Sequence, residues 1–253
     1  MKRKITLAVA IFIIFIVSVL VHMPIQAVLN YVALPAQLSI SGASGTLWQG
    51  QAQQITWQRY QLGQMSWQFE PRALLDGNAQ AKVRFGRGSQ WQLQGRGSLG
   101  YGLNGAYAQN VLASLPMSEA LKFAPPMPVP LDLNGQLELN IHHLTYAQPY
   151  CAQGKGRLVW STDAIGTPLA PLIIGPVIAE ITCQNSTIQV AGSQQSSQVR
   201  SGFSLDLKAN RQYVAQAWFS PQGEMPDALS EQLKWLPKPD TQGRYQFNQQ
   251  GRL

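Results

Sequence analysis

The run QMSWQFEPRALLDGNAQAKVRF, residues 64–85, carries two alternating patterns of apolar and polar residues on either side of a short break. In QMSWQFE (64–70) and AQAKVRF (79–85), every second side chain is apolar, which is the period of a half-buried β-strand. The dipeptide Asp76-Gly77 between them is a common turn signal. This stretch predicts two antiparallel strands joined by a short connection.

The same period recurs along the chain from residue 37 onward. Glycine-rich breaks separate the other alternating runs, which are QLSISG (37–42), QQITWQ (53–58), SQWQLQG (89–95), LDLNGQLELNI (131–141) and GFSLDLKA (202–209). Helical periodicity is confined to two short segments, NVLASLPMSEALKF (110–123) and ALSEQLKWL (228–236), and Pro116 interrupts the first. We therefore predict an all-β fold built as a curved, mainly antiparallel sheet.

The segment APPMPVP, residues 124–130, cannot form regular structure, because its prolines remove backbone donors and fix φ. We expect it to be a seam between a first half of the β domain, about 37–123, and a second half, about 131–253. The pattern leaves open whether the two halves share one continuous sheet.

The N-terminus has a different character. Three basic residues at 2–4 precede ITLAVAIFIIFIVSVLV (5–21), which carries no charge and approaches the ~17–25 residues of a bilayer-spanning helix. We expect a cytoplasmic tip (1–4), a single transmembrane anchor (5–22), a juxtamembrane linker or short helix (23–36) and an exported β domain (37–253). A cleaved signal peptide is the alternative, although bulky Ile25 makes Ile25-Gln26-Ala27 a poor cleavage site.

Composition argues against nucleic acid as a partner. Charged residues make up 12% of the chain, against roughly 25% in an average soluble protein. The formal net charge is +7, but the tip at 2–4 accounts for three of those charges. The remaining basic residues are scattered and form no stripe with interleaved aromatic residues.

The two cysteines, Cys151 and Cys183, predict a disulfide, because an even pair in an exported domain is usually oxidised. Closing this loop should stabilise the fold by ~3–4 kcal/mol on the chain-entropy estimate. Their spacing does not match a zinc site, and the chain has no CxxC redox motif.

The residues that usually carry chemistry are not grouped in this sequence. His142 and His143 point to opposite faces of a strand, so they cannot bind one metal together. Asp132 and Glu138 would lie roughly 20 Å apart along a strand, which is too far for paired acid–base catalysis. No phosphate-binding loop or GxSxG motif occurs. We expect no enzymatic activity, no cofactor and no metal.

Four tryptophans, Trp48, Trp57, Trp67 and Trp91, lie in or beside the alternating runs. One interpretation is that they fill the core of a curved sheet, where each buries ~150–250 Å². The other is that some of them line an exposed apolar groove that receives a lipid or a partner strand. These four residues are the candidate partner or groove surface.

Several segments carry a resemblance to a known family. They are the basic tip and apolar run at 2–21, GTLWQG (45–50), SWQFEPRALLDGNAQAKVRF (66–85), LDLNGQLELNI (131–141), GRLVWSTDAI (157–166) and GRYQFNQQGRL (243–253). In this order, and over nearly the whole length, the chain resembles the type II secretion system protein N family of Gram-negative bacteria.

The resemblance implies a single-pass protein of the bacterial inner membrane, with a cytoplasmic N-terminus and a periplasmic β domain. Such a protein would be an accessory or structural subunit for the export of folded proteins, in contact with other type II secretion system subunits of the inner-membrane platform or with the secretin. It implies no catalytic residue or cofactor. The segment WQFEPRALLDGNA (67–79) also resembles AsmA-like periplasmic proteins, which implies an alternative function as a lipid or hydrophobic-ligand carrier with a β groove.

Overall fold

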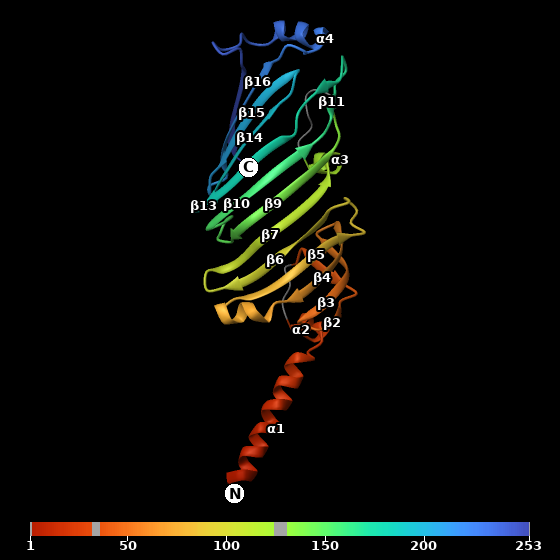
Figure 1. Ribbon diagram of the computed structural model, residues 1–253, viewed down its shortest axis with the longest axis vertical. Helices are drawn as coiled ribbons and strands as arrows, with labels where there is room; N and C mark the ends of the chain where they lie inside the picture. The colour runs from red at the N-terminus through yellow and green to blue at the C-terminus, as the bar shows by residue number, and fades with distance from the viewer. Residues whose placement is uncertain (1, 32–35, 124–130, 253) are drawn as a thin grey trace.

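The computed structural model describes residues 2–31, 36–123 and 131–252. A helix projects from one end of an elongated β domain, and successive strands lead the chain away from that helix (Figure 1). The seam predicted at 124–130 lies outside the described residues, as do residues 32–35 of the predicted juxtamembrane segment.

Helices account for a small part of the described chain. The α-helices are α1 (Lys2–Val21), α2 (Ile25–Tyr31), α3 (Met117–Ala120) and α4 (Asp227–Ser230), and the 3₁₀ helices are η1 (Pro71–Asp76), η2 (Leu121–Phe123) and η3 (Glu231–Trp235). α2 follows Pro24, so residues 25–31 of the predicted juxtamembrane segment form a short helix. Within the described residues, no helix combines the length and the apolar character that a membrane crossing needs.

Most of the alternating runs in the sequence correspond to strands of the β domain. Its strands are β1 (Leu38–Ser41), β2 (Ser44–Gly45), β3 (Gln49–Trp57), β4 (Tyr60–Phe69), β5 (Ala79–Arg87), β6 (Gln94–Gly102), β7 (Gly105–Pro116), β8 (Asp132–Leu133), β9 (Gln136–Thr145), β10 (Gln153–Ser161), β11 (Ala164–Gly166), β12 (Leu172–Ile173), β13 (Val177–Gln184), β14 (Thr187–Gln195), β15 (Val199–Leu207), β16 (Gln212–Pro221) and β17 (Tyr245–Arg252).

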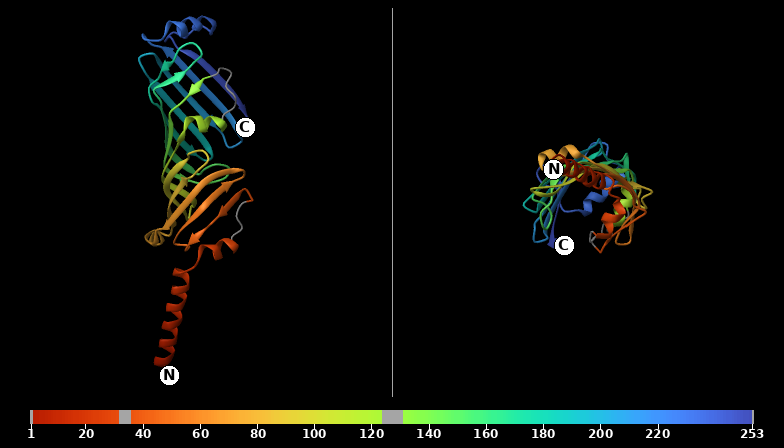
Figure 2. Two further views of the ribbon diagram at one scale, coloured as in Figure 1. Left: turned by 90° about the vertical axis from the view of Figure 1, so that its right-hand side faces the viewer. Right: turned by 90° about the horizontal axis from the view of Figure 1, so that it is seen from below.

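One long antiparallel sheet contains most of these strands. Among the described residues it has 14 strands, in the order β1-β3-β4-β5-β6-β7-β9-β10-β13-β14-β15-β16-β17, with β2 beside β3. β8, β11 and β12 form a separate three-stranded sheet. Because β7 pairs directly with β9, the main sheet runs from one half of the β domain into the other. The sheet curls about its long axis, so that the view from below resembles an incomplete ring (Figure 2).

Two local predictions were wrong. The run 89–95 was expected to be a strand, but β6 begins only at Gln94. The preceding residues form a turn, in which Gln92 has a φ of 54°. The alternation of apolar and polar residues continues in the sequence although the chain turns here. Gly86 and Gly88 permit the change of direction, with φ values of 102° and 72°.

The second wrong prediction concerns residues 110–116, expected to begin a short helix. They belong to β7, which pairs with both β6 and β9, so hydrogen bonding on two sides outweighs local helix propensity. The helical residues follow Pro116, in α3 and η2. The short helix predicted over 228–236 is confirmed by α4 and η3.

The register places apolar residues in one continuous row across the sheet. Cross-strand partners on this row are Ala52, Met65, Phe85, Gly95, Ala113, Leu139, Leu158, Ala179, Gly192, Phe203, Ala217 and Phe247. The next row, on the opposite face, is mostly polar: Gln51, Ser66, Arg84, Arg96, Leu112, Asn140, Arg157, Glu180, Ala191, Ser204, Gln216 and Asn248. The sheet therefore has one apolar and one polar face.

The apolar face is only partly covered. On the apolar row, Ala52 and Ala179 are 1% exposed, whereas Phe203 is 36% and Phe247 45% exposed. Sheets usually bury their apolar face against a second layer of secondary structure. Here the second layer is incomplete, which leaves room for another molecule on that face.

Candidate binding surfaces

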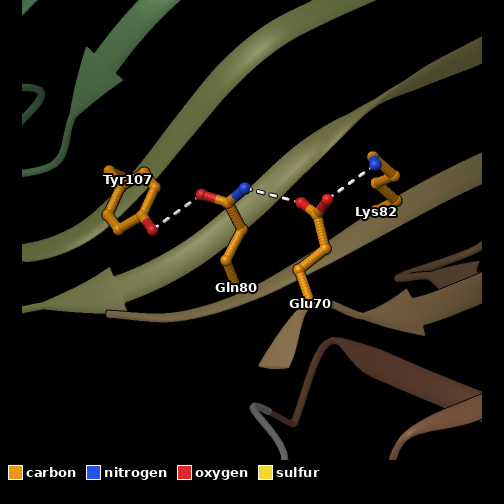
Figure 3. Close-up of polar contacts among 4 residues, drawn as sticks. All are labelled: Glu70, Gln80, Lys82 and Tyr107. Atoms are coloured by element: carbon orange, nitrogen blue, oxygen red, sulfur yellow. Dashed lines mark hydrogen bonds and ion pairs between the residues drawn. The ribbon is translucent and has the colours of Figure 1, made fainter. Parts of the chain in front are cut away.

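A chain of four polar side chains crosses part of the sheet (Figure 3). The Tyr107 hydroxyl donates to Gln80 Oε1 at 2.8 Å, and Gln80 Nε2 donates to Glu70 Oε2 at 2.6 Å. Lys82 Nζ lies 2.6 Å from Glu70 Oε1. Tyr107 on β7 reaches Gln80 on β5 across Gly100 of β6, where any Cβ would collide with the tyrosine ring.

The electrostatics of this network point to a structural role. The hydrogen bonds from Lys82 and then Gln80 hold the pKa of Glu70 below its ordinary value. Burial, and then the negative charge of Glu70, raises the pKa of Tyr107, so the phenol keeps its proton and remains a donor. Glu70 directly precedes η1, so the network ties the turn between β4 and β5 to the sheet and leaves no free acid or base.

The last strand, β17, offers a surface of a different kind. It pairs with β16 on one side, and no described strand pairs with its other side. Seven of its eight residues are exposed. An exposed edge of this length, without proline and with a single charged residue, is a template for pairing with another chain. The opposite edge strand, β1, has four residues.

The register shows which main-chain groups of β17 are free. The Lys208 N–H donates to the Gln212 carbonyl at 2.9 Å, so even-numbered residues of β16 bond toward β15. Main-chain groups alternate sides along an antiparallel strand, so odd-numbered residues of β16, such as Phe219 opposite Tyr245, bond toward β17. The residues of β17 whose N–H and C=O groups point away from the sheet are therefore Gln246, Asn248, Gln250 and Arg252.

Stacked aromatic rings mark the apolar side of this edge. The Phe219 ring stacks on Tyr245 at 5.0 Å and on Phe247 at 6.0 Å, with 14° between the planes in both pairs. An added strand would place alternate side chains beside Phe247 and thereby extend the apolar row by one residue.

An apolar cavity of about 420 Å³ lies beside the disulfide. The predicted bond between Cys151 and Cys183 is confirmed, with their Cα atoms 6.3 Å apart. The side chains of Leu139, Ile141 and Ile181 also line the cavity. Its volume is within the roughly 300–1,000 Å³ of typical ligand sites.

The four tryptophans make different local contacts. Trp48 makes an edge-on contact with Phe69, with ring centroids 4.8 Å apart, and Trp91 contacts Tyr60 at 4.7 Å. Trp67 is half-buried and donates its indole N–H to the main-chain carbonyls at positions 46 and 47, at 3.3 and 3.2 Å. Trp57 is 42% exposed at the end of β3. Their assignment as a groove or partner surface stays a prediction.

Neither the aromatic edge nor the cavity could be recognised from the sequence alone. The alternation of Tyr245 and Phe247 with polar residues was a signal for β17, but it could not show that this strand is last in the sheet. The cavity combines residues of β9, β10, β13 and β14, which only the fold brings together. Among the described residues, no three His, Cys, Asp or Glu side chains are grouped to hold a metal ion.

Comparison with known proteins identifies the family. The family model for type II secretion system (T2SS), protein N, matches residues 36–248. The chain belongs to the type II secretion system protein N family. A family member from Vibrio cholerae serotype O1 is 46% identical over 253 residues, and one from Aeromonas hydrophila is 32% identical over 256 residues. Each of these two alignments covers 100% of both chains.

More distant protein N relatives extend the comparison. One from Klebsiella pneumoniae is 25% identical over 99% of this chain and 97% of its own length. No solved structure matches the chain. The family match spans the main sheet from β1 into β17, so the whole cavity and the first half of the free edge, up to residue 248, fall within the family's shared region.

Proposed function

We propose that this protein is an accessory subunit of the type II secretion system that acts through protein–protein contacts. The observation that carries the proposal is membership of the protein N family over residues 36–248. The names of the relatives place them in this secretion system. The proposal assigns no catalytic step to the chain, and the polar network of Glu70 is accounted for by its structural role.

The proposal includes a location. Residues 5–22 would anchor the protein in the bacterial inner membrane, with the N-terminus cytoplasmic and the β domain periplasmic. Two observations support it: residues 5–21 carry no charge, and apolar side chains along the described part of α1 are exposed, including Phe12 at 62% and Ile14 at 68%. Exposing apolar side chains to water costs free energy, whereas contact with lipid hydrocarbon does not.

The contact surface in this proposal is the free edge of β17. A sheet edge binds an extended segment through main-chain hydrogen bonds, and the neighbouring side chains select the segment. On the polar face of this edge the side chains of Gln246, Asn248 and Gln250 are amides, so the partner strand need not carry charge. On the other face it would place apolar residues beside Phe247. The partner we propose is an extended segment of another secretion subunit.

A proline substitution separates edge pairing from other effects. Asn248→Pro removes an N–H that points away from the sheet, and edge strands tolerate proline at such a position. Asn248→Ala changes the side chain but keeps the N–H. Phe247→Pro removes an N–H that bonds to β16, so it should release β17 from the sheet and serves as the control for loss of the strand.

The measurement is photo-crosslinking in cells from a benzoylphenylalanine placed at Gln250. We expect capture of a secretion-system subunit, identified by mass spectrometry, in the parent protein and with Asn248→Ala. The same adduct should be lost with Asn248→Pro, while far-UV circular dichroism shows an intact sheet. Equal capture with Asn248→Pro, or an adduct containing no secretion component, would contradict the proposal.

A further inference from the structure

We propose that the apolar cavity beside the Cys151–Cys183 disulfide binds an acyl chain of a phospholipid. This ligand is additional to the protein contacts of the proposed function. The site would accommodate one hydrocarbon chain in the cavity and the second chain along the adjoining apolar row of the sheet. Leu139 belongs both to the cavity and to that row, so the two surfaces are continuous.

The walls of the cavity come from two sources. The sheet contributes residues of β9, β10, β13 and β14, including Ile141, Ile181 and Ile188. Glycines at 154 and 156 add no side chains to this lining, which also includes His143 and Lys155. The loop between β9 and β10 contributes Tyr150 and Cys151 as the opposite wall.

That loop is fixed in two ways, so the cavity does not depend on a mobile lid. The disulfide joins Cys151 of the loop to Cys183 of β13. The buried Ser186 hydroxyl accepts from the Tyr150 N–H at 3.3 Å and lies 3.2 Å from the Gln148 carbonyl, to which it can donate. A fixed wall keeps the cavity open without a ligand, which reduces the cost of binding.

The chemistry of the walls selects hydrocarbon over polypeptide. Cavity-lining strands β9, β10 and β13 each pair on both sides, so their main-chain groups are already hydrogen-bonded within the sheet. A peptide buried there would lose hydrogen bonds to water and gain none, at a cost of roughly 1–3 kcal/mol for each unpaired group. An acyl chain has no polar groups to satisfy and gains only from burial. Peptides are therefore expected at the edge, and acyl chains on this face.

The experiment uses the full chain in vesicles of phosphatidylethanolamine and phosphatidylglycerol. The probe is a phosphatidylethanolamine with a diazirine in one acyl chain, and labelled peptides are mapped by mass spectrometry after illumination. We expect label on peptides covering 137–158 and 177–190. Any label on residues 2–31 serves as the internal measure of general membrane exposure. The mass of the adduct tells whether the attached molecule is the phospholipid or a free fatty acid released from it.

Two variants test the site itself. Ile141→Trp fills the cavity and should lower cavity labelling by about tenfold relative to labelling of residues 2–31. Asn140→Trp places the same side chain on the exposed opposite face of β9 and should leave labelling unchanged. Gly154→Leu fills the cavity from β10, where the nearest obstacle to a Cβ is the end of the flexible Leu144 side chain at 2.8 Å. Absence of free thiols and a β-type circular dichroism spectrum confirm that each variant is folded.

Several outcomes would overturn the inference. Label confined to residues 2–31 excludes the site, and equal labelling of Ile141→Trp and Asn140→Trp excludes this cavity as its location. An adduct with the mass of free fatty acid excludes phospholipid as the ligand. The edge variant Asn248→Pro should keep full cavity labelling, so failure of the lipid site and failure of the proposed subunit contact are seen in separate measurements.

Discussion

Removing the disulfide should destabilise the β domain by an amount that the structure allows us to estimate. Cys151 and Cys183 are separated by 32 positions in the sequence. On the chain-entropy model, a crosslink that closes such a loop lowers the entropy of the unfolded chain enough to stabilise the fold by about 3.7 kcal/mol at 25 °C. Both sulfur atoms are buried, so Cys151→Ala with Cys183→Ala loses a further ~1 kcal/mol of packing. The expected total is about 4–5 kcal/mol.

The assay is urea unfolding of the full chain in detergent, followed by tryptophan fluorescence and far-UV circular dichroism. The double alanine variant should have a lower midpoint and a steeper denaturant dependence, because its unfolded chain is more expanded. Reduced parent protein should match the variant to within about 1 kcal/mol, since both lack the crosslink. A loss below about 1 kcal/mol, with the two optical signals coinciding, would refute the reasoning that the crosslink constrains the chain that unfolds.

Three further predictions concern side chains of the sheet. The pKa of Glu70 is lowered in the folded state, so the ionised Glu70 carboxylate should stabilise the fold fully above pH 4.5, its ordinary pKa, and less as the pH falls below that value. Glu70→Gln should therefore reduce the loss of unfolding free energy that urea titrations show between pH 7 and 3. Gly192→Val would collide with the Phe203 ring at 2.5 Å and should cost about 1–3 kcal/mol, whereas Gly223→Ala meets nothing within 4 Å and should leave the urea midpoint unchanged. Trp67→Phe removes the indole N–H donor to two main-chain carbonyls and should lower the free energy of unfolding by about 1 kcal/mol; no change would show that water replaces this bond.

The all-β class and many of the strands could be predicted from the sequence, because the period-two pattern is a local property. Residues 64–69 and 79–85 alternate as expected and lie within β4 and β5. The disulfide was also predictable, since two cysteines allow a single pairing. These predictions needed no knowledge of which strand lies next to which.

Features that depend on neighbouring strands were not predictable in this way. Residues 110–116 have helical propensity, and only pairing with β6 and β9 makes them a strand. The free edge follows from the position of β17 at the end of the strand order. The stack of Phe219 on Tyr245 and Phe247 likewise requires β16 and β17 to be neighbours. Local alternation gives each strand its two faces but does not fix the order of the strands.

The same sheet can serve two kinds of ligand because its face and its edge differ in which groups remain unsatisfied. On the face, main-chain donors and acceptors are paired between strands, and what remains is apolar surface such as Phe203. On the edge, the reverse holds: Asn248 and its even-numbered neighbours have unpaired main-chain groups. Water can hydrogen-bond to the free main-chain groups of the edge, so pairing with a partner strand adds more specificity than binding free energy. Water makes no comparable interaction with the apolar face, so a lipid binds there mainly through burial of apolar surface. It follows that the edge can exchange protein partners while the face stays occupied, and Asn248→Pro and Ile141→Trp should therefore have independent effects.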